Sequence, residues 1–351
     1  MAVIQSPSQA AASARRRGAR NYVLRRIGLY LLTVWAAITL AFILFRIMPG
    51  DPISILLAQL SILEGKQQVG AQNIVATYRA MFGLDDPIYI QYVAFLRNIV
   101  TGFDFGPSFV QFPTRAQELI ARHLPWTVLL FSTSMLLAWI IGTAIGTVVG
   151  WMRRTRLASL TSAFLTLLQV TPVYLMALAL IIIFGYRLGW LPTGKPYDAH
   201  LQPALTWEFI SSVMWHMVLP MLSMVLVWGA AWGMGMRQLV ISILGEDYLV
   251  YAKAKGLSPR IVLKDYAFRN ALLPQVAGLA IALGATLNGA YIVEIIFGIP
   301  GLGELFVKAM AVRDYNVMQG VVILSMIGVL TMGLVVDLSL PLLDPRIRVA
   351  Q

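Results

Sequence analysis

Six long runs of uncharged, mostly apolar residues constrain this sequence more than any other feature. Each run is long enough to cross the hydrocarbon core of a bilayer, which takes about 20 residues of α-helix. The chain is 58% hydrophobic and 12% charged, whereas soluble domains are about 25% charged. The sequence therefore predicts an all-α membrane protein with six transmembrane helices. The runs are residues 27–45, 124–152, 157–186, 209–236, 270–293 and 315–336.

The distribution of basic residues predicts which side of the membrane each connection faces. With a cytoplasmic amino terminus, the inside segments are 1–26, 153–156, 237–269 and the tail after Asp337. They hold 17 of the 27 Lys and Arg residues but 4 of the 16 acidic residues. Cytoplasmic connections carry the excess of Lys and Arg, so we expect both termini in the cytoplasm. The net charge of +11 thus flanks the membrane, which argues against a nucleic-acid partner.

These assignments divide the chain into five parts. The first apolar run is too long for the core of a cleaved signal peptide, so we expect it to be retained. The parts are a basic cytoplasmic tail (1–26), the first transmembrane helix (27–48), an extracytoplasmic segment (49–123), a core of five helices (124–340) and a cytoplasmic tail (341–351).

The extracytoplasmic segment 49–123 is too charged to span but carries several short amphipathic runs. The runs ISILLAQL, IVATYRAMF, IYIQYVAFLRNIV and ELIARHL have apolar residues at helical spacing. Thr114 and Gln117 have the spacing of a capping box before the last of them. We expect several short helices lying on the outer membrane face.

The cytoplasmic loop 237–274 is the long basic, helix-competent segment of the chain. Four side chains in it fall at helical spacing: Tyr248, Leu249, Tyr251 and Ala252. Gly256 follows where a helix end needs a residue that tolerates a left-handed conformation. This pattern predicts a short helix that ends at Gly256.

A second helix is expected directly after this glycine. Ser258 and Pro259 are an N-cap and a first-turn proline, and the helix should run towards Pro274, near the start of the next apolar run. Two helices that meet at a tight bend would make a compact knob on the cytoplasmic side.

The loop sequence DYLVYAKAKGLSPRIVLKDYAFRNALLP resembles the cytoplasmic EAA loop of permease subunits of ABC importers, in particular the oligopeptide, dipeptide and nickel group. The general motif has Glu-Ala-Ala six to four residues before its glycine, where this chain has Val250, Tyr251 and Ala252, so only the last position fits. The Leu-Pro pair also lies further from the glycine, as it does in the peptide group. Other stretches resemble the same group: FRIMPGDP, GLDDPIYIQYVAFL, TGFDFGPSF, FGIPGLGELFVKAMAVRDYN and VDLSLPLLDPRIRV.

The resemblance implies a type I ABC importer permease fold in a bacterial or archaeal inner membrane, in contact with membrane lipid. Such a subunit pairs with a second homologous permease and docks two ABC ATPase subunits, which carry the ATP and Mg. It receives solute from an extracytoplasmic substrate-binding protein. The chain itself would bind no cofactor and would not be an enzyme. The cargo would be peptides or similar small solutes, with oligosaccharides, opines and nickel as alternatives.

The resemblance also suggests where the functional residues lie. In the cytoplasmic loop, Tyr248, Leu249, Tyr251 and Ala252 would enter a cleft of an ATPase subunit, Lys253 and Lys255 would lie at its rim, and Gly256 and Ser258 would form the turn. For the translocation path, we expect uncharged polar and aromatic residues from the spans. The candidates are Thr171, Tyr174, Asn288 and Tyr291.

A self-contained ion-coupled carrier or channel is the rival interpretation, with a membrane-embedded hydrolase behind it. The apolar runs are nearly free of ionisable residues, whereas ion-coupled carriers need titratable or liganding groups near the midplane. The chain has no cysteine and 3 histidines, and it lacks the HExxH and GxSxG motifs of hydrolases. Glu294 and Asp337 lie at the ends of spans, where both packing and capping roles are open.

Glycines recur at four-residue spacing in two of the runs. Such steps allow two helix backbones to approach closely. The contact is either a tight one inside this subunit or a face for a partner subunit. The glycines are Gly142, Gly146 and Gly150 in the second run and Gly229 and Gly233 in the fourth.

Overall fold

The computed structural model describes residues 7–48, 86–109, 111, 113–285 and 291–343, and within these ranges the regular secondary structure is helical. Extended pairing there is limited to a single bridge between Pro107 and Arg115. The helices are α1 (Pro7–Ile47), α4 (Ile88–Gly102), α5 (Ala116–Trp151), α6 (Arg156–Val170), α7 (Val173–Leu180), the π-helical turn η1 (Ile181–Arg187), α8 (Trp207–Ile243), α9 (Asp247–Ala254), α10 (Pro259–Ile261), the π-helical turn η2 (Val262–Phe268), α11 (Arg269–Ala285), α12 (Tyr291–Phe297), α13 (Leu302–Ala311) and α14 (Tyr315–Leu343).

Five of the described helices are long and apolar enough to cross a membrane, and a bent pair makes a sixth span if it is counted as one. The prediction of an all-α membrane protein with six spans is confirmed in this form. The five are Asn21–Ile47, Ala116–Trp151, Trp207–Ile243, Pro259–Gly284 and Tyr315–Ser339, and the bent pair is Arg156–Val170 with Val173–Arg187.

The third apolar run is broken, whereas the sequence suggested one continuous helix. α6 and α7 meet at an angle of 100°. Thr171 has extended backbone angles, φ −77° and ψ 124°, because the ring of a following proline, here Pro172, disfavours the helical region for the residue before it. The break therefore divides this span into two halves, α6 before it and α7 with η1 after it.

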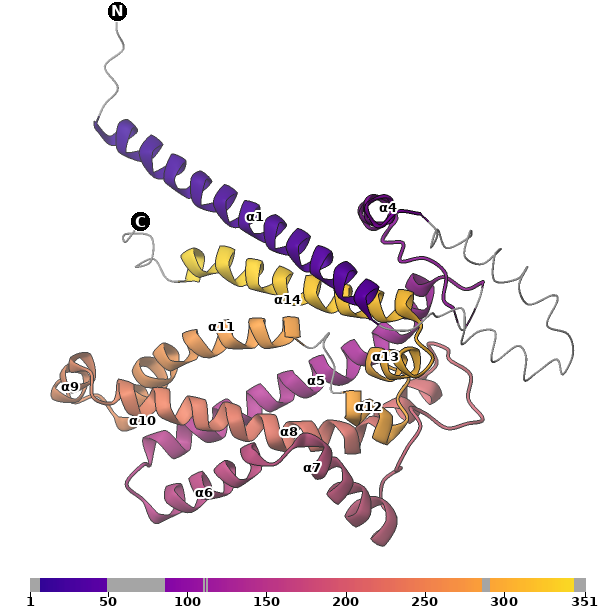
Figure 1. Ribbon diagram of the computed structural model, residues 1–351. Helices are drawn as coiled ribbons and strands as arrows, with labels where there is room; N and C mark the ends of the chain where they lie inside the picture. Colours follow the sequence, from indigo (N-terminus) through magenta and orange to yellow (C-terminus); the bar gives the residue numbers. More distant parts are fainter. Residues whose placement is uncertain (1–6, 49–85, 110, 112, 286–290, 344–351) are drawn as a thin grey trace, which may run out of the picture.

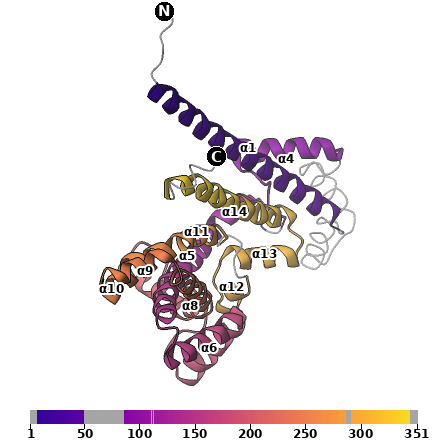
Figure 2. The same ribbon diagram turned by 90° about the vertical axis from the view of Figure 1, so that its left-hand side faces the viewer.

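The long helices form a bundle in which α5 and α8 lie at the centre and make the most extensive contact among the described elements. Figure 2 shows α14 between α1 and the rest of the bundle, with α6 at the opposite edge. The start of α1, the end of α14 and the short helix α9 lie at one end of the bundle, and α4, α12 and α13 lie at the other (Figure 1).

The glycine steps of α5 and α8 face each other inside the chain. A Cβ added at Gly142 or Gly146 would overlap the backbone of Gly229 or Gly233, respectively. One added at Gly150 would lie 2.9 Å from the Cβ of Val240. The intramolecular alternative is therefore correct, and these faces of α5 and α8 are not available to a partner subunit.

α1 is attached to the bundle mainly through α14. Near the end that holds α9, Arg26 Nη1 donates to Asp337 Oδ2 at 2.7 Å, and the hydroxyl of Tyr22 donates to the carbonyl of Asp337 at 3.0 Å. One turn further along the interface, the hydroxyls of Tyr30 and Thr331 lie 2.8 Å apart. Of the two roles left open for Asp337, the structure shows packing: it anchors α1 on α14.

The described part of segment 49–123, which the sequence predicts to be extracytoplasmic, contains α4, which corresponds to the run IYIQYVAFLRNIV, while ISILLAQL and IVATYRAMF lie outside the described residues. The run ELIARHL is not a separate helix, because it forms the first turns of α5. The predicted capping box is also wrong: the N-cap of α5 is Arg115, without a side-chain cap. Asn316 Nδ2 donates to the carbonyl of Pro107 at 2.8 Å, which ties TGFDFGPSF to the start of α14.

Candidate functional site

The helix expected before Gly256 is α9, which begins at Asp247 and ends at Ala254. Asp247 in its first turn and Lys253 in its last have the charges that the helix dipole favours at each end. The amide of Gly256 donates to the carbonyl of Lys253 at 2.9 Å, and its φ of +72° lies in the left-handed region. Glycine adopts this conformation without steric cost, so it ends the helix here.

α9 is held on the bundle by two of its apolar side chains. Leu249 and Ala252 are 0% and 2% exposed and form a buried cluster with Val262. The end of α5, the end of α8, the turn before α10 and η2 all contribute side chains that pack against this cluster. These side chains are Trp151, Ile243, Leu244, Leu257 and Tyr266. Leu249 and Ala252 therefore face this chain and are not exposed for a direct contact with another protein, contrary to the expectation.

The other face of α9 is open. Tyr251 is 70% exposed and Val250 61% exposed, and Lys253 and Lys255 are also exposed. Tyr248 is 37% exposed, and its hydroxyl accepts a hydrogen bond of 3.4 Å from Asn270 Nδ2. Partial burial and the negative charge of Glu246 raise the pKa of Tyr248. Sequence reasoning missed the exposed Val250.

The segment after Gly256 leads without a break into a membrane span. Ser258 precedes the helix but its side chain makes no cap hydrogen bond, and Pro259 occupies the first helical position. The second helix does not end at Pro274. α10, η2 and α11 form one span from Pro259 to Gly284, and Pro274 lies inside it. A π-helical turn inside an α-helix is frequent at functional sites, and this one lies in the first part of the span that follows α9.

The translocation candidates fall in two places. Thr171 lies at the break between α6 and α7, where its hydroxyl donates to the carbonyl of Leu167 at 2.8 Å. Tyr174 follows in the first turn of α7 and is 39% exposed. Tyr291 begins α12 and stacks on Phe306, with ring centroids 5.5 Å apart. Asn288 lies outside the described residues.

Two of the helices that carry these candidates, α7 and α12, are packed together. Ala177 and Leu180 of α7 share a buried cluster with Val293 and Phe297 of α12. The structure thus brings the neighbourhoods of Tyr174 and Tyr291 together. It also gives Tyr291 a packing role through Phe306, which the sequence did not indicate.

Glu294 caps the start of α13, which was one of the two roles left open for it. Its carboxylate is 0% exposed and accepts hydrogen bonds from the amides of Gly303 (2.7 Å) and Glu304 (3.2 Å) and from the Thr127 hydroxyl (2.7 Å). Thr127 Oγ1 in turn accepts from the amide of Leu302 at 2.7 Å. This network connects α5, α12 and α13 at the end of the bundle opposite α9.

Titratable groups elsewhere make structural contacts. His216 Nδ1 lies 2.8 Å from the carbonyl of Ser212, and its Nε2 lies 3.9 Å from Asp198. His123 Nδ1 lies 2.7 Å from the carbonyl of Leu119. Among the residues that the structure describes, no group of three His, Cys, Asp or Glu side chains is arranged to hold a metal ion.

Two family matches cover most of the chain. Residues 142–349 match the family described as binding-protein-dependent transport system inner membrane component. Residues 20–133 match the family that describes the N-terminal part of such membrane components. The first match contains α9, η2 and α11, and the second contains α1 from residue 20 onward, α4 and the beginning of α5.

Curated relatives align over nearly the whole chain. The dipeptide transport system permease protein of Bacillus subtilis is 32% identical over 329 residues, which cover 93% of this chain and 98% of the relative. The oligopeptide transport system permease protein of Haemophilus influenzae is 31% identical, with coverages of 93% and 99%. The glutathione transport system permease protein of Escherichia coli K12 is 31% identical, with the same coverages.

Proposed function

The chain belongs to the family of binding-protein-dependent transport system inner membrane components, and we propose that it forms half of the translocation path of an importer of peptides. It is a multi-pass permease subunit of an ABC importer rather than a self-contained ion-coupled carrier. Permease subunits of this family are not themselves enzymes. The relatives are named for dipeptides, oligopeptides and glutathione, and this common chemistry is the reason for proposing peptide cargo.

The proposed coupling helix is α9. Tyr248, Tyr251, Lys253 and Lys255 form its contact surface for an ATPase subunit, with Val250 added to the residues expected from sequence. Leu249 and Ala252, on the buried side of α9, hold it against the bundle. Gly256 and Ser258 form the turn that follows it. The observation that carries this proposal is the division of α9 into a fully buried face and a face on which Tyr251 is 70% exposed.

Two connections would transmit a movement of α9 into the membrane. The first is covalent, through η2 into α11. The second is the buried cluster of Leu249, Ala252 and Val262, against which Trp151 of α5 and Ile243 of α8 pack. A nucleotide-driven change that pulls on α9 would thus act on three spans together and shift the population between two conformations.

We further propose that α9 and both termini face the cytoplasm. This orientation is supported by the excess of Lys and Arg in the segments at that end, and by the position of α9 at the same end of the bundle as the start of α1 and the end of α14 (Figure 1). In this arrangement α4, α12 and α13 face the extracytoplasmic binding protein. The partners would be two ATPase subunits with ATP and Mg, a second homologous permease and that binding protein.

The proposed path runs past the break between α6 and α7. Backbone groups freed by a helix break inside a membrane must be satisfied by protein or must line a water-filled cavity. Thr171 and Tyr174 lie at this break, and together with Asn288 and Tyr291 they are our candidates for groups that contact cargo.

Photo-crosslinking tests the coupling contact directly. Replacing Tyr251 by a photoreactive phenylalanine analogue should give a crosslink to an ATPase subunit in the assembled complex. The matched control is Tyr186, which is 75% exposed but lies at the end of η1, on the proposed outer side. A crosslink to the ATPase from position 186, or none from position 251 in an assembled complex, would contradict the proposal.

A further inference from the structure

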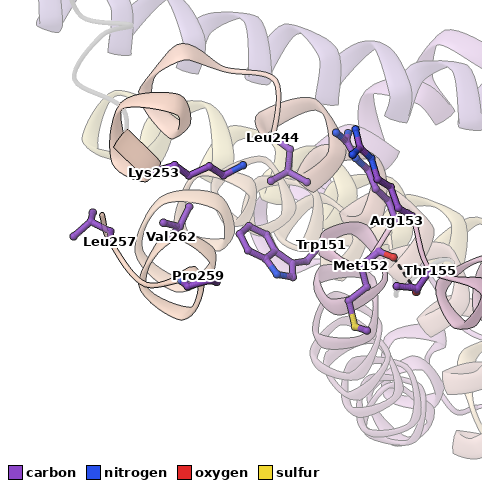
Figure 3. Close-up of a pocket in the computed structure, with 10 residues that line it drawn as sticks. Trp151, Met152, Arg153, Thr155, Leu244, Lys253, Leu257, Pro259 and Val262 are labelled. Atoms are coloured by element: carbon purple, nitrogen blue, oxygen red, sulfur yellow. Dashed lines mark hydrogen bonds between the residues drawn. The ribbon is translucent and has the colours of Figure 1, made fainter. Parts of the chain in front are cut away.

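A basic groove opens beside α9, between the end of α5 and the start of α10. Its volume is about 480 Å³, within the range of about 300–1,000 Å³ that is usual for ligand sites. Figure 3 shows Lys253 reaching in from the side of α9 and Arg153 on the opposite side, with Trp151 between them. The lining residues are Trp151, Met152, Arg153, Arg154, Thr155, Leu244, Lys253, Leu257, Pro259 and Val262.

The charge of the groove is entirely positive. Three of its lining residues, Arg153, Arg154 and Lys253, are cationic, and none is acidic. All three side chains are exposed. Within the ranges that the structure describes, none of them forms a salt bridge. Arg153 makes one long hydrogen bond, of 3.4 Å, to the carbonyl of Ile241. The groove therefore favours an anion.

The rest of the groove is apolar and lies where two spans end. Trp151 is the last residue of α5, and Leu244 directly follows α8. Met152 is 40% exposed. Tryptophan and arginine beside the end of a span are typical of the depth at which lipid headgroups lie. A soluble anion would use the cations but leave this apolar surface in contact with water.

An apolar stripe begins just beyond the groove. α6 starts one residue after Thr155, and three of its apolar side chains at helical spacing are exposed: Leu157 at 66%, Leu160 at 70% and Phe164 at 58%. A lipid headgroup in the groove would have apolar protein surface for its acyl chains within reach, which favours a phospholipid over a free phosphate.

We propose that this groove binds the headgroup phosphate of an anionic phospholipid from the cytoplasmic leaflet. Basic pockets between helices on this side of a membrane bind such headgroups. The cations come from two elements, because Arg153 and Arg154 lie in the turn after α5 while Lys253 lies on α9. A phosphate held by both would bridge them and stabilise the position of α9 on the bundle.

The inference requires that the loop with α9 faces the cytoplasm, but it does not require that α9 contacts an ATPase subunit. It can therefore be tested separately from the proposed function. The chain contains no cysteine, and Met152→Cys therefore places a single bimane fluorophore at the groove. The full-length protein is placed in bilayer discs that contain brominated phosphatidylglycerol or brominated phosphatidylcholine, and the quenching of bimane is compared. Three variants are made in this background: the double variant Arg153→Gln with Arg154→Gln, the single variant Lys253→Gln, and the control Arg260→Gln. Arg260 is an exposed basic residue of the same loop that does not line the groove.

We expect phosphatidylglycerol to quench at least several-fold more effectively than phosphatidylcholine, and this preference to weaken with salt. The double arginine variant and Lys253→Gln should lose the preference, and Arg260→Gln should keep it.

Equal quenching by the two lipids would overturn the proposal, and so would a preference that survives in the double variant. Displacement of phosphatidylglycerol by an equal concentration of soluble glycerol 1-phosphate would mean a free-anion site and would also overturn the proposal. If the double variant fails to fold, the lipid preference of Lys253→Gln decides the question.

Discussion

Leu249 of α9 and Val262, the first residue of η2, are buried in the same apolar cluster at the end of the bundle. The two residues lie on opposite sides of the turn at Gly256, so their contact closes the turn and fixes α9 against the helix that continues into the membrane. Tyr251, two residues after Leu249, points away from this cluster and is 70% exposed. One short helix thus has an anchoring side and a free side.

The first prediction separates these two sides. Leu249→Ala removes buried apolar contacts, a change that costs about 2–5 kcal/mol in protein cores, so we expect the loop to loosen and to become sensitive to protease. Tyr251→Ala should leave the protease pattern of the free subunit unchanged but weaken binding of the ATPase subunits. Limited proteolysis of the subunit and co-purification of the ATPases measure the two effects. Equal loop protection in both variants would contradict the assignment of the buried side.

The second prediction concerns the turn after α9. Gly256→Val should uncouple ATP hydrolysis from transport while the protein still inserts, because a side chain at φ +72° costs about 1–2 kcal/mol. A Cβ at this position meets nothing within 4 Å, so the effect would come from the backbone conformation alone. ATPase and uptake assays on the reconstituted complex measure it.

Gly189 offers a matched control for that prediction. It has a φ of +63°, and a Cβ there also meets nothing within 4 Å, but it lies in the connection after η1. Gly189→Val should therefore keep hydrolysis and uptake coupled. Uncoupling by both variants would show that the effect is general and does not arise at α9.

The third prediction tests the central helix pair. Gly146→Ala should lower the melting temperature in detergent, because the new methyl group would overlap the backbone of Gly233, and overpacking costs about 1–3 kcal/mol. Gly28→Ala is the control, since Gly28 is also helical but has open space around it. If the two variants melt at the same temperature, α5 and α8 are not as close as described.

The fourth prediction concerns the end of the bundle opposite α9. Thr127→Val keeps the shape of the side chain but removes the donor to Glu294 and the acceptor for the amide of Leu302. A buried polar group left without its partner costs about 1–3 kcal/mol, so the melting temperature should fall. Thr166→Val, at an exposed threonine that bonds only to its own helix, should have little effect. A stable Thr127→Val protein would show that the cap on α13 is dispensable.

The sequence was a good guide to the spans but a poor guide to where they break. Pro125, Pro220 and Pro274 lie inside α5, α8 and α11, whereas Pro172 accompanies a bend of 100°. Neighbouring helices can satisfy the backbone groups that a proline frees, so the outcome depends on tertiary packing. A proline in an apolar run does not by itself predict a break.

The same limit applies to the candidate site. Leu249 with Ala252, and Tyr248 with Tyr251, are two pairs at the same helical spacing, so periodicity finds both stripes and cannot tell which one faces the bundle. The glycine spacing predicted that helices approach closely, but it did not indicate that α5 and α8 are each other's partners, because this pairing depends on the fold. The basic groove combines residues from distant segments, Arg153 and Lys253, and local patterns do not reveal such a juxtaposition.

The most direct test of the central claim is peptide uptake by proteoliposomes. This chain is reconstituted either alone or with a second permease, the ATPase subunits and the binding protein, and uptake of a labelled peptide is followed with and without ATP. The account predicts ATP-dependent uptake by the complete assembly and none by the chain alone. Uptake by the chain alone, without ATPase subunits and a partner permease, would contradict it.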